Sequence, residues 1–131
     1  MPKKPPRRIP DEMFNALFAA LKYNRDRALL AAWVSTGARA DEMLTSRQLD
    51  TDPGQQLITF VRKGTWESQP LPASPDTFVW LRLYHEDARR QGAPRGHQLP
   101  LWWTLRRPWR PLNYHAARAM FDRANDLLGS N

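Results

Sequence analysis

The sequence predicts an α+β fold, mainly helical, with a small antiparallel β-sheet packed against the helices. Apolar residues recur at helical spacing in the first third of the chain and again after residue 74. Between these stretches lie two runs rich in β-forming residues, 57–61 and 66–71. A length of 131 residues with 41% hydrophobic content suits one compact domain. We therefore expect a domain over 11–131, preceded at 1–10 by a basic, Pro-rich linker or arm.

Two helices open the predicted domain. Residues 11–22 carry apolar side chains at helical spacing, and two acids at the start suit the helix dipole. Asn24 is expected to cap a second helix that runs through 28–34 and ends near Gly37. This helix is apolar on most sides, which predicts a central position. Residues 40–44 are expected to add one more helical turn.

The sheet is predicted around a β-hairpin. The runs 57–61 and 66–71 flank a short Gly-bearing connection at 62–65, which favours a hairpin. A turn at 52–54 follows a short stretch around 48–50, where we expect a first strand. The prolines within 70–72 are expected to end the sheet.

Two more helices are predicted in the second half of the chain. Ser74, Pro75 and Asp76 form a strong helix start, and that helix should continue to about Arg90 and stop near Gly92. Residues 92–110 read as a loop. A last helix is expected from about 113 to 128, with an apolar stripe facing the core or an interface and with Gly129 as its terminator.

The charge indicates a polyanionic partner. Twenty basic residues against thirteen acidic residues give a net charge of +7 and a pI of about 10.5. Residues 88–121 hold seven arginines and no aspartate or glutamate. Arginine outnumbers lysine sixteen to four, and planar guanidinium groups suit bidentate phosphate contacts, although a GC-rich genome gives the same bias.

Several classes of protein are disfavoured by composition. The chain has no cysteine, which excludes disulfides and thiolate metal sites and favours a reducing cytoplasm. No apolar run approaches membrane-spanning length, and the basic N-terminus lacks the apolar segment of a secretory signal. The three histidines share no metal-ligand spacing, so no metal or other cofactor is expected.

The stretch Ser35-Thr36-Gly37-Ala38-Arg39-Ala40-Asp41-Glu42-Met43-Leu44 carries the main functional signal. With the preceding hydrophobic helix, it resembles the first catalytic box of tyrosine recombinases of the phage integrase type. The resemblance continues through the Lys-Gly of the expected hairpin at 60–65 and the strand end at 69–72. The tail at 121–131 is similar to the helix that precedes the family's H-x-L-R-H box. These segments follow one another in the family's order over nearly the whole chain.

The resemblance implies roles for named residues. Arg39 would clamp the reacting phosphate, Lys63 would act as general acid on the leaving hydroxyl, and Glu42 would orient neighbouring groups. The parent protein would cleave and rejoin DNA without a cofactor, with duplex DNA and further recombinase protomers as partners. The expected DNA-binding residues are Arg62, Arg106, Arg107 and Arg110.

The chain also departs from the family pattern. The family's H-x-x-R pair and tyrosine nucleophile would lie beyond Asn131, so we expect a fragment of the catalytic domain that is inactive alone. Tyr23, Tyr84 and Tyr114 stand in the wrong places for the nucleophile.

Other interpretations stay open from the sequence. The chain is alternatively a non-catalytic DNA-binding or regulatory module, or an interaction domain whose basic surface is incidental. Arg39 could pair with Asp41 or Glu42, and Lys63 could be a solvated charge at a hairpin tip. The tryptophans of 102–109 could stack on bases or lie in the core. Paired acids at 41–42 and at 50 and 52 could serve a metal nuclease, but a helix start and a turn explain them better.

Overall fold

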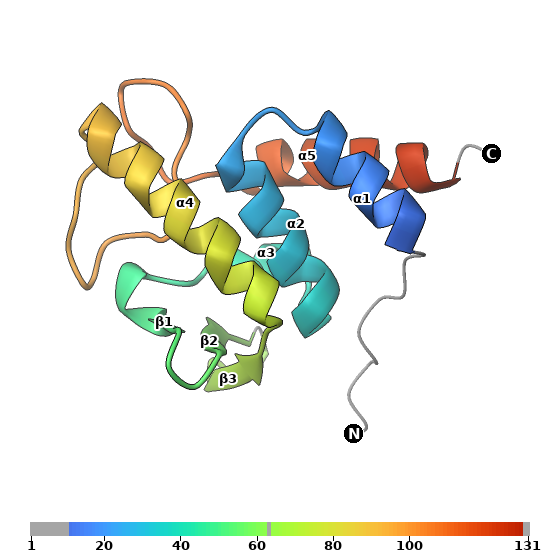
Figure 1. Cartoon of the computed structure of the whole chain (residues 1–131). Helices are drawn as coiled ribbons and strands as arrows, with labels where there is room; N and C mark the ends of the chain where they lie inside the picture. The colour runs from blue at the N-terminus through green and yellow to red at the C-terminus, as the bar shows by residue number, and fades with distance from the viewer. Residues whose placement is uncertain (1–10, 63, 130–131) are drawn as a thin grey trace.

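The chain folds into five α-helices and a three-stranded sheet among the residues that the computed structural model describes, 11–62 and 64–129. The expected arm at 1–10 lies outside them. Helices gather on one side of the small sheet, so the α+β prediction is confirmed (Figure 1). In chain order the elements are α1 (Asp11–Ala20), α2 (Asn24–Thr36), α3 (Ala40–Met43), a 3₁₀ helix η1 (Gln48–Asp50), β1 (Thr51–Asp52), β2 (Leu57–Val61), β3 (Ser68–Pro72), α4 (Pro75–Gln91) and α5 (Tyr114–Gly129).

Helix α2 forms the centre of the core, as its apolar sequence predicts. All residues of the segment 28–33 are buried, and α2 packs against α4 and β3. Helix α5 packs against α1 and α3, where Ala117 and Met120 are buried. The side chains of Phe121 and Leu128, on the same predicted stripe, lie outside the described set. The helix includes Gly129, so the predicted terminator is one position too early.

The predicted N-cap of α2 is wrong. Asn24 is the first residue inside the helix, and the capping position belongs to Tyr23, which makes no side-chain cap. The Asn24 amide instead donates to the Asp87 carboxylate (2.8 Å) and its oxygen accepts from the guanidinium of Arg27 (2.9 Å). The first of these contacts joins α2 to α4, so a tertiary partner has displaced the local cap.

The predicted strand around 48–50 is also wrong. This segment is the 3₁₀ helix η1, and the strand β1 follows it as two residues that pair antiparallel with β2. The N–H groups of Gln48 and Leu49 donate to the carbonyls of Leu99 (2.8 Å) and His97 (3.1 Å). Because the distant loop takes these donors, the segment cannot pair with β2.

The hairpin of β2 and β3 is confirmed, with Ile58 opposite Leu71. Its second strand begins at Ser68 and not at Trp66, because Trp66 has a positive φ of 59° that a pleated strand does not accept. The strand ends at Pro72, as predicted, whereas Pro70 lies within β3. They belong to an edge strand, and they face Thr59 and Leu57 at positions where no N–H is needed for pairing with β2.

Helix α4 begins as predicted. The Ser74 hydroxyl accepts from the N–H of Thr77 (3.3 Å), Pro75 is the first helical residue, and Gly92 ends the helix at φ 85°. The following residues, 93–113, form a long irregular connection to α5. Backbone hydrogen bonds to the segment 46–49, among them a bridge from Arg47 to Pro100, fix it to the rest of the fold. A second bridge, from Trp103 to Pro111, closes it on itself.

Candidate functional site

Arg39 lies at the start of α3, where a tight turn sets its direction. The Thr36 hydroxyl donates to the carbonyl of Ala32 (2.7 Å) and accepts from the N–H of Ala38 (3.1 Å). Between them Gly37 has a φ of 70°, and its N–H donates to the Trp33 carbonyl (3.2 Å). A residue with a side chain is strained at such a φ, so the Thr-Gly pair is what turns the chain from α2 into α3.

The Arg39 guanidinium is largely open to solvent. Its side chain is 72% exposed, and its Nε lies 3.5 Å from the Asp41 carboxylate. An exposed ion pair of this kind contributes about 0–1 kcal/mol, so the fold does not depend on it. The pairing with Asp41 therefore leaves the other guanidinium N–H groups of Arg39 able to meet an anion.

Glu42 follows Arg39 by one helical turn and is buried. Burial agrees with a structural role for Glu42, a role that the sequence predicts whether or not the chain is catalytic. The turn after it is closed by Thr45, whose backbone N–H (3.1 Å) and hydroxyl (2.6 Å) both donate to the Glu42 carbonyl.

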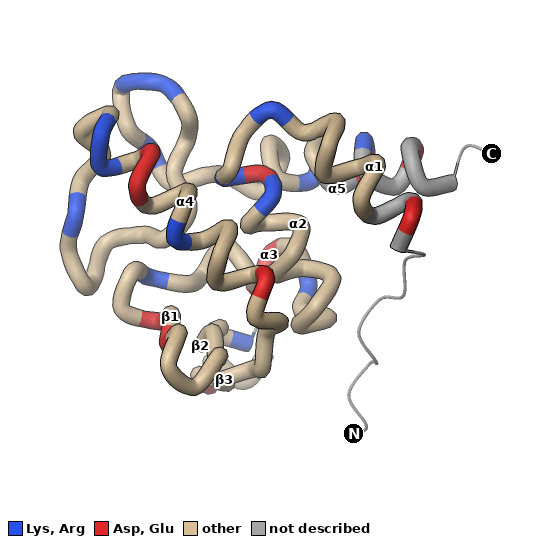
Figure 2. Tube along the Cα trace, in the orientation of Figure 1, with Lys and Arg blue, Asp and Glu red and all other residues tan. Residues whose placement is uncertain are grey.

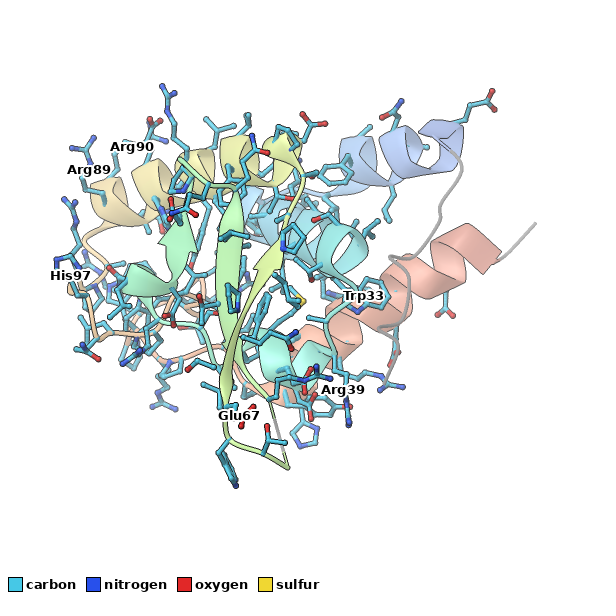
Figure 3. The ribbon with its side chains drawn as sticks, turned by 90° about the horizontal axis from the view of Figure 1, so that it is seen from below. Trp33, Arg39, Glu67, Arg89, Arg90 and His97 are labelled. Atoms are coloured by element: carbon cyan, nitrogen blue, oxygen red, sulfur yellow. The ribbon has the colours of Figure 1, made fainter. Side chains whose placement is uncertain are left out.

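Two hydroxyls fasten the hairpin to the segment that carries Arg39. The Thr45 hydroxyl accepts from the N–H of Val61 (2.9 Å), and the Ser46 hydroxyl donates to the carbonyl of Thr59 (2.7 Å). Figure 3 shows the result, with Arg39 and Glu67 toward the same end of the molecule. The structure thus brings together the Arg39 turn and the hairpin that the sequence singled out.

The hairpin tip carries Arg62 and Trp66 on its exposed surface. Arg62 donates to the Gln69 side chain (2.7 Å), and its carbonyl accepts from the N–H of Trp66 (2.8 Å). Trp66 is 75% exposed. Lys63, expected to be the general acid, lies outside the described residues. Trp66 is not among the residues that the sequence pattern singled out, although an aromatic residue close to a glycine turn is a visible signal.

The other three expected DNA-binding arginines lie elsewhere. Arg106, Arg107 and Arg110 are exposed on the loop between α4 and α5. Figure 2 shows basic residues on this loop at the opposite end of the molecule from β2 and β3. Thr104 closes the loop, because its N–H donates to the Arg110 carbonyl (2.8 Å), and Arg107 donates to the carbonyl of Gln91 (2.9 Å). The structure does not bring these arginines next to Arg39.

Some arginines make contacts within the fold and are not available to a partner at the surface. Arg25 forms a largely buried ion pair with Asp26 (2.8 Å) and also donates to the Trp103 carbonyl (3.2 Å). Arg27 lies over the ring of Trp80, with 5.4 Å to its centroid, and donates to the carbonyl of Phe18 (3.3 Å). The charge count of the sequence therefore overstates the positive charge available to a partner.

Tyr84 is unsuited to nucleophilic attack, in agreement with the sequence analysis. It is buried, its hydroxyl donates to the Leu101 carbonyl (2.8 Å), and it accepts from the N–H of Trp103 (2.9 Å). Burial raises the pKa of Tyr84 to about 12. A phenol that is held protonated and enclosed cannot reach a phosphodiester. Tyr114 accepts from Arg118 (3.0 Å) on the surface of α5.

The tryptophans of the long connection contribute to the core, one of the two roles the sequence left open. Trp102 is buried, stacks on Tyr84 with ring centroids 5.6 Å apart, and donates its indole N–H to the Met43 carbonyl (3.1 Å). Trp103 is buried as well, whereas Trp109 is only partly covered. Through Met43, Trp102 supports the helix that begins beside Arg39.

Metal and membrane features are absent from the part of the chain that the structure describes. Within 11–62 and 64–129, no group of three or more His, Asp or Glu side chains is arranged to hold a metal ion. No helix in this part has both the length and the apolar character to cross a membrane.

The fold matches solved recombinase and integrase structures. The XerA recombinase matches with a TM-score of 0.70 at 16% identity, over 98% of this chain and 45% of XerA. The integrase of mycobacterium phage Brujita gives 0.57 at 21% identity, over 98% and 40% of the two chains. The integrase of the Tn1549 transposon, solved in complex with circular intermediate DNA, gives 0.65 at 18% identity, over 99% and 45%.

These matches define the fold of the chain as that of recombinase and integrase structures, of which it spans less than half the length. No family model matches the sequence, and no curated protein matches it either. At identities of 16% to 21% the similarity is one of fold. The roles of individual residues therefore depend on the geometry of this chain.

Proposed function

We propose that this chain is the front part of a tyrosine recombinase catalytic domain and that Arg39 binds the phosphate of a DNA strand. The observation that carries the proposal is the position of Arg39, an open guanidinium on a turn that Thr36 and Gly37 hold fixed. The fold shared with recombinases and integrases supports it. A guanidinium on a fixed turn can donate two parallel hydrogen bonds to a phosphate without the backbone first having to become ordered.

The chemistry of strand transfer explains the proposed site. Attack on a phosphodiester places negative charge on the non-bridging oxygens, which Arg39 would stabilise. Lys63 would donate a proton to the departing 5′-hydroxyl. It belongs to the hairpin that Thr45 and Ser46 fasten to the segment carrying Arg39. Glu42, buried in α3 one turn after Arg39, would orient the neighbouring groups of the site. In the parent protein a phosphotyrosine link would conserve the energy of the broken bond, so the reaction would need neither metal nor nucleotide.

Duplex DNA is the proposed partner, together with further recombinase protomers in the parent protein. The integrase of Tn1549 is solved with DNA, and this chain carries a net charge of +7. Arg62 would contact the backbone next to the Arg39 turn. Arg106, Arg107 and Arg110 would contact it from the other end of the molecule. The chain alone is expected to bind DNA without cleaving it.

The test is duplex binding by fluorescence anisotropy over a range of salt concentrations, with Arg39→Ala and a matched control. Arg90→Ala is that control, because Arg90 is 70% exposed and also pairs with an aspartate, Asp87. Figure 3 shows Arg90 far from Arg39. We expect Arg39→Ala to weaken binding several-fold and to reduce the salt slope by about 1. Arg90→Ala should leave both nearly unchanged.

The same titration separates the alternative functions. Salt-dependent DNA binding whose affinity is unchanged by Arg39→Ala would indicate a DNA-binding module without the phosphate clamp. Affinity without salt dependence, or no affinity, would indicate an interaction domain, since phosphate contacts must weaken as salt rises. Either result would overturn the proposed role of Arg39.

A further inference from the structure

A hollow lies between α4 and the loop that follows it. Its volume is about 780 Å³, within the range of roughly 300–1,000 Å³ that small-molecule sites occupy. One wall is the outer face of α4 from Phe78 to Arg89, and the facing wall is the loop segment 93–97. Residues of η1 and β1 close one side. None of the residues proposed above to contact DNA lines it.

The floor of the hollow is apolar and well packed. Leu81, Leu101 and Trp103 line it and are each buried, while Phe78 is partly exposed at its edge. Side chains held in the core in this way keep their places when a ligand enters. Because these three side chains are almost fully covered, the apolar surface that a ligand can reach comes mainly from partly exposed Phe78 and from exposed Pro94 on the facing wall.

The Gln48 side chain helps to hold the facing wall in place, in addition to the backbone bonds from η1 to His97 and Leu99. Its amide nitrogen donates to the carbonyls of Pro94 (3.1 Å) and Pro100 (3.3 Å), and its amide oxygen accepts from the N–H of Gly96 (3.2 Å). Three hydrogen bonds from one residue fix the loop over the hollow before any ligand arrives. A preformed site loses less entropy on binding than one that must order a loop.

The rim of the hollow is cationic. Arg82, Arg89 and Arg95 line it against a single acid, Glu86, which already pairs with Arg82 (3.4 Å). Among the described residues, neither Arg89 nor Arg95 has a carboxylate partner. The position of Arg89 suits the C-terminal end of α4, but that explanation does not extend to Arg95, which lies in the loop.

Two histidines add donors and acceptors to the same rim. Figure 3 shows His97 and Arg89 on the same side of the molecule, away from Arg39. Desolvation by the surrounding atoms lowers the pKa of His85, and the positive charge of Arg95 lowers it further. His85 is therefore neutral at pH 7, and the arginines supply the positive charge.

We propose that this hollow is a binding site for a small organic anion, separate from the Arg39 turn. The apolar body of the ligand would lie against Phe78 and Pro94, above the buried floor, and its carboxylate, phosphate or sulfonate group would meet Arg89 and Arg95. The apolar floor disfavours a DNA backbone, which is charged along its whole length. The ligand class is thus an amphipathic anion. The site does not depend on the proposed DNA-binding function.

The test uses 8-anilinonaphthalene-1-sulfonate, a fluorescent anion with an apolar ring system, titrated into the whole chain. We expect saturable binding at one site. Arg89→Ala and Arg95→Ala should each weaken it about tenfold or more, because each removes a charge-assisted hydrogen bond. Arg90→Ala is the control, since Arg90 follows Arg89 on the same helix but does not line the hollow. Backbone amide shifts in NMR should map to Gly96 and its neighbours.

Several outcomes would overturn the proposal. Equal effects of Arg89→Ala and Arg90→Ala would show a diffuse attraction to a basic surface. Displacement of the probe by an equal concentration of inorganic sulfate would show that the apolar floor contributes nothing. If Arg89→Ala weakens duplex binding as much as probe binding, the hollow is part of the DNA surface. Failure of the Arg39→Ala test, by contrast, leaves this site untouched.

Discussion

Removal of the Tyr84 hydroxyl tests how the long connection is held against the helices. That hydroxyl donates to the Leu101 carbonyl (2.8 Å) and accepts from the Trp103 N–H (2.9 Å), and it is buried. Tyr84→Phe keeps the ring and its stacking on Trp102 but leaves two buried backbone groups without partners. Each unsatisfied group costs about 1–3 kcal/mol. We therefore expect the free energy of unfolding to fall by about 2–6 kcal/mol.

The assay is urea unfolding followed by circular dichroism, with Tyr23→Phe as the matched control. Tyr23 is 51% exposed, so its substitution should change stability by less than about 0.5 kcal/mol. In thermal unfolding, Tyr84→Phe should lower the Tm by roughly 10 °C. A loss below about 0.5 kcal/mol for Tyr84→Phe, with an unchanged urea slope, would refute the reasoning, because the two backbone groups would then have found other partners.

The raised pKa of Tyr84 gives a second measurement on the same residue. The folded phenol keeps its proton to about pH 12, whereas the unfolded phenol loses it near its usual value of 10.0. Between these two values the folded state binds more protons than the unfolded state. Stability should therefore decrease as pH rises from about 10 to 12, and Tyr84→Phe should remove this contribution.

Three further changes are expected to have distinct results. Ser74→Ala should cost about 1 kcal/mol in urea unfolding because the Thr77 N–H loses its cap, and a loss near zero would mean that water replaces it. Because the pKa of His85 is lowered, its unfolded form takes up a proton first as pH falls below its usual 6.5, so stability should decrease there; His85→Gln should abolish that dependence. Trp66→Phe should leave stability within about 0.5 kcal/mol because the Trp66 side chain is 75% exposed, and a loss above about 1 kcal/mol would contradict this.

The local elements of this fold follow from local chemistry, and the sequence predicts them. The Ser74–Pro75 start of α4, the Gly37 turn after α2 and the hairpin of β2 and β3 each depend on residues close together in the chain. Left-handed turns favour glycine, and an N-cap favours a side-chain oxygen that can accept a hydrogen bond. The same short-range rules place Arg39 directly after a turn, and the resemblance of this segment to the first catalytic box of tyrosine recombinases makes Arg39 the candidate site residue.

The predictions that proved wrong involve partners distant in sequence. Asn24 does not cap α2 because Asp87 of α4 takes its amide, and η1 is not a strand because carbonyls of the loop near Leu99 take its N–H groups. Thr45 could not be recognised as the residue that fastens the hairpin to α3, since its partner Val61 is sixteen residues away. Such choices between competing hydrogen-bond partners are made only when the chain folds on itself.

The sequence alone therefore determined the fold class and the order of the helices, and its resemblance to tyrosine recombinases made Arg39 the candidate phosphate-binding residue. Only the tertiary structure decided which arginines are free to meet a partner. It used Arg25 and Arg27 within the fold, left Arg39 open, and set Arg89 and Arg95 around an apolar hollow. The physical reason is that helical periodicity and turn chemistry act over a few residues, whereas burial and charge pairing depend on neighbours that only packing supplies.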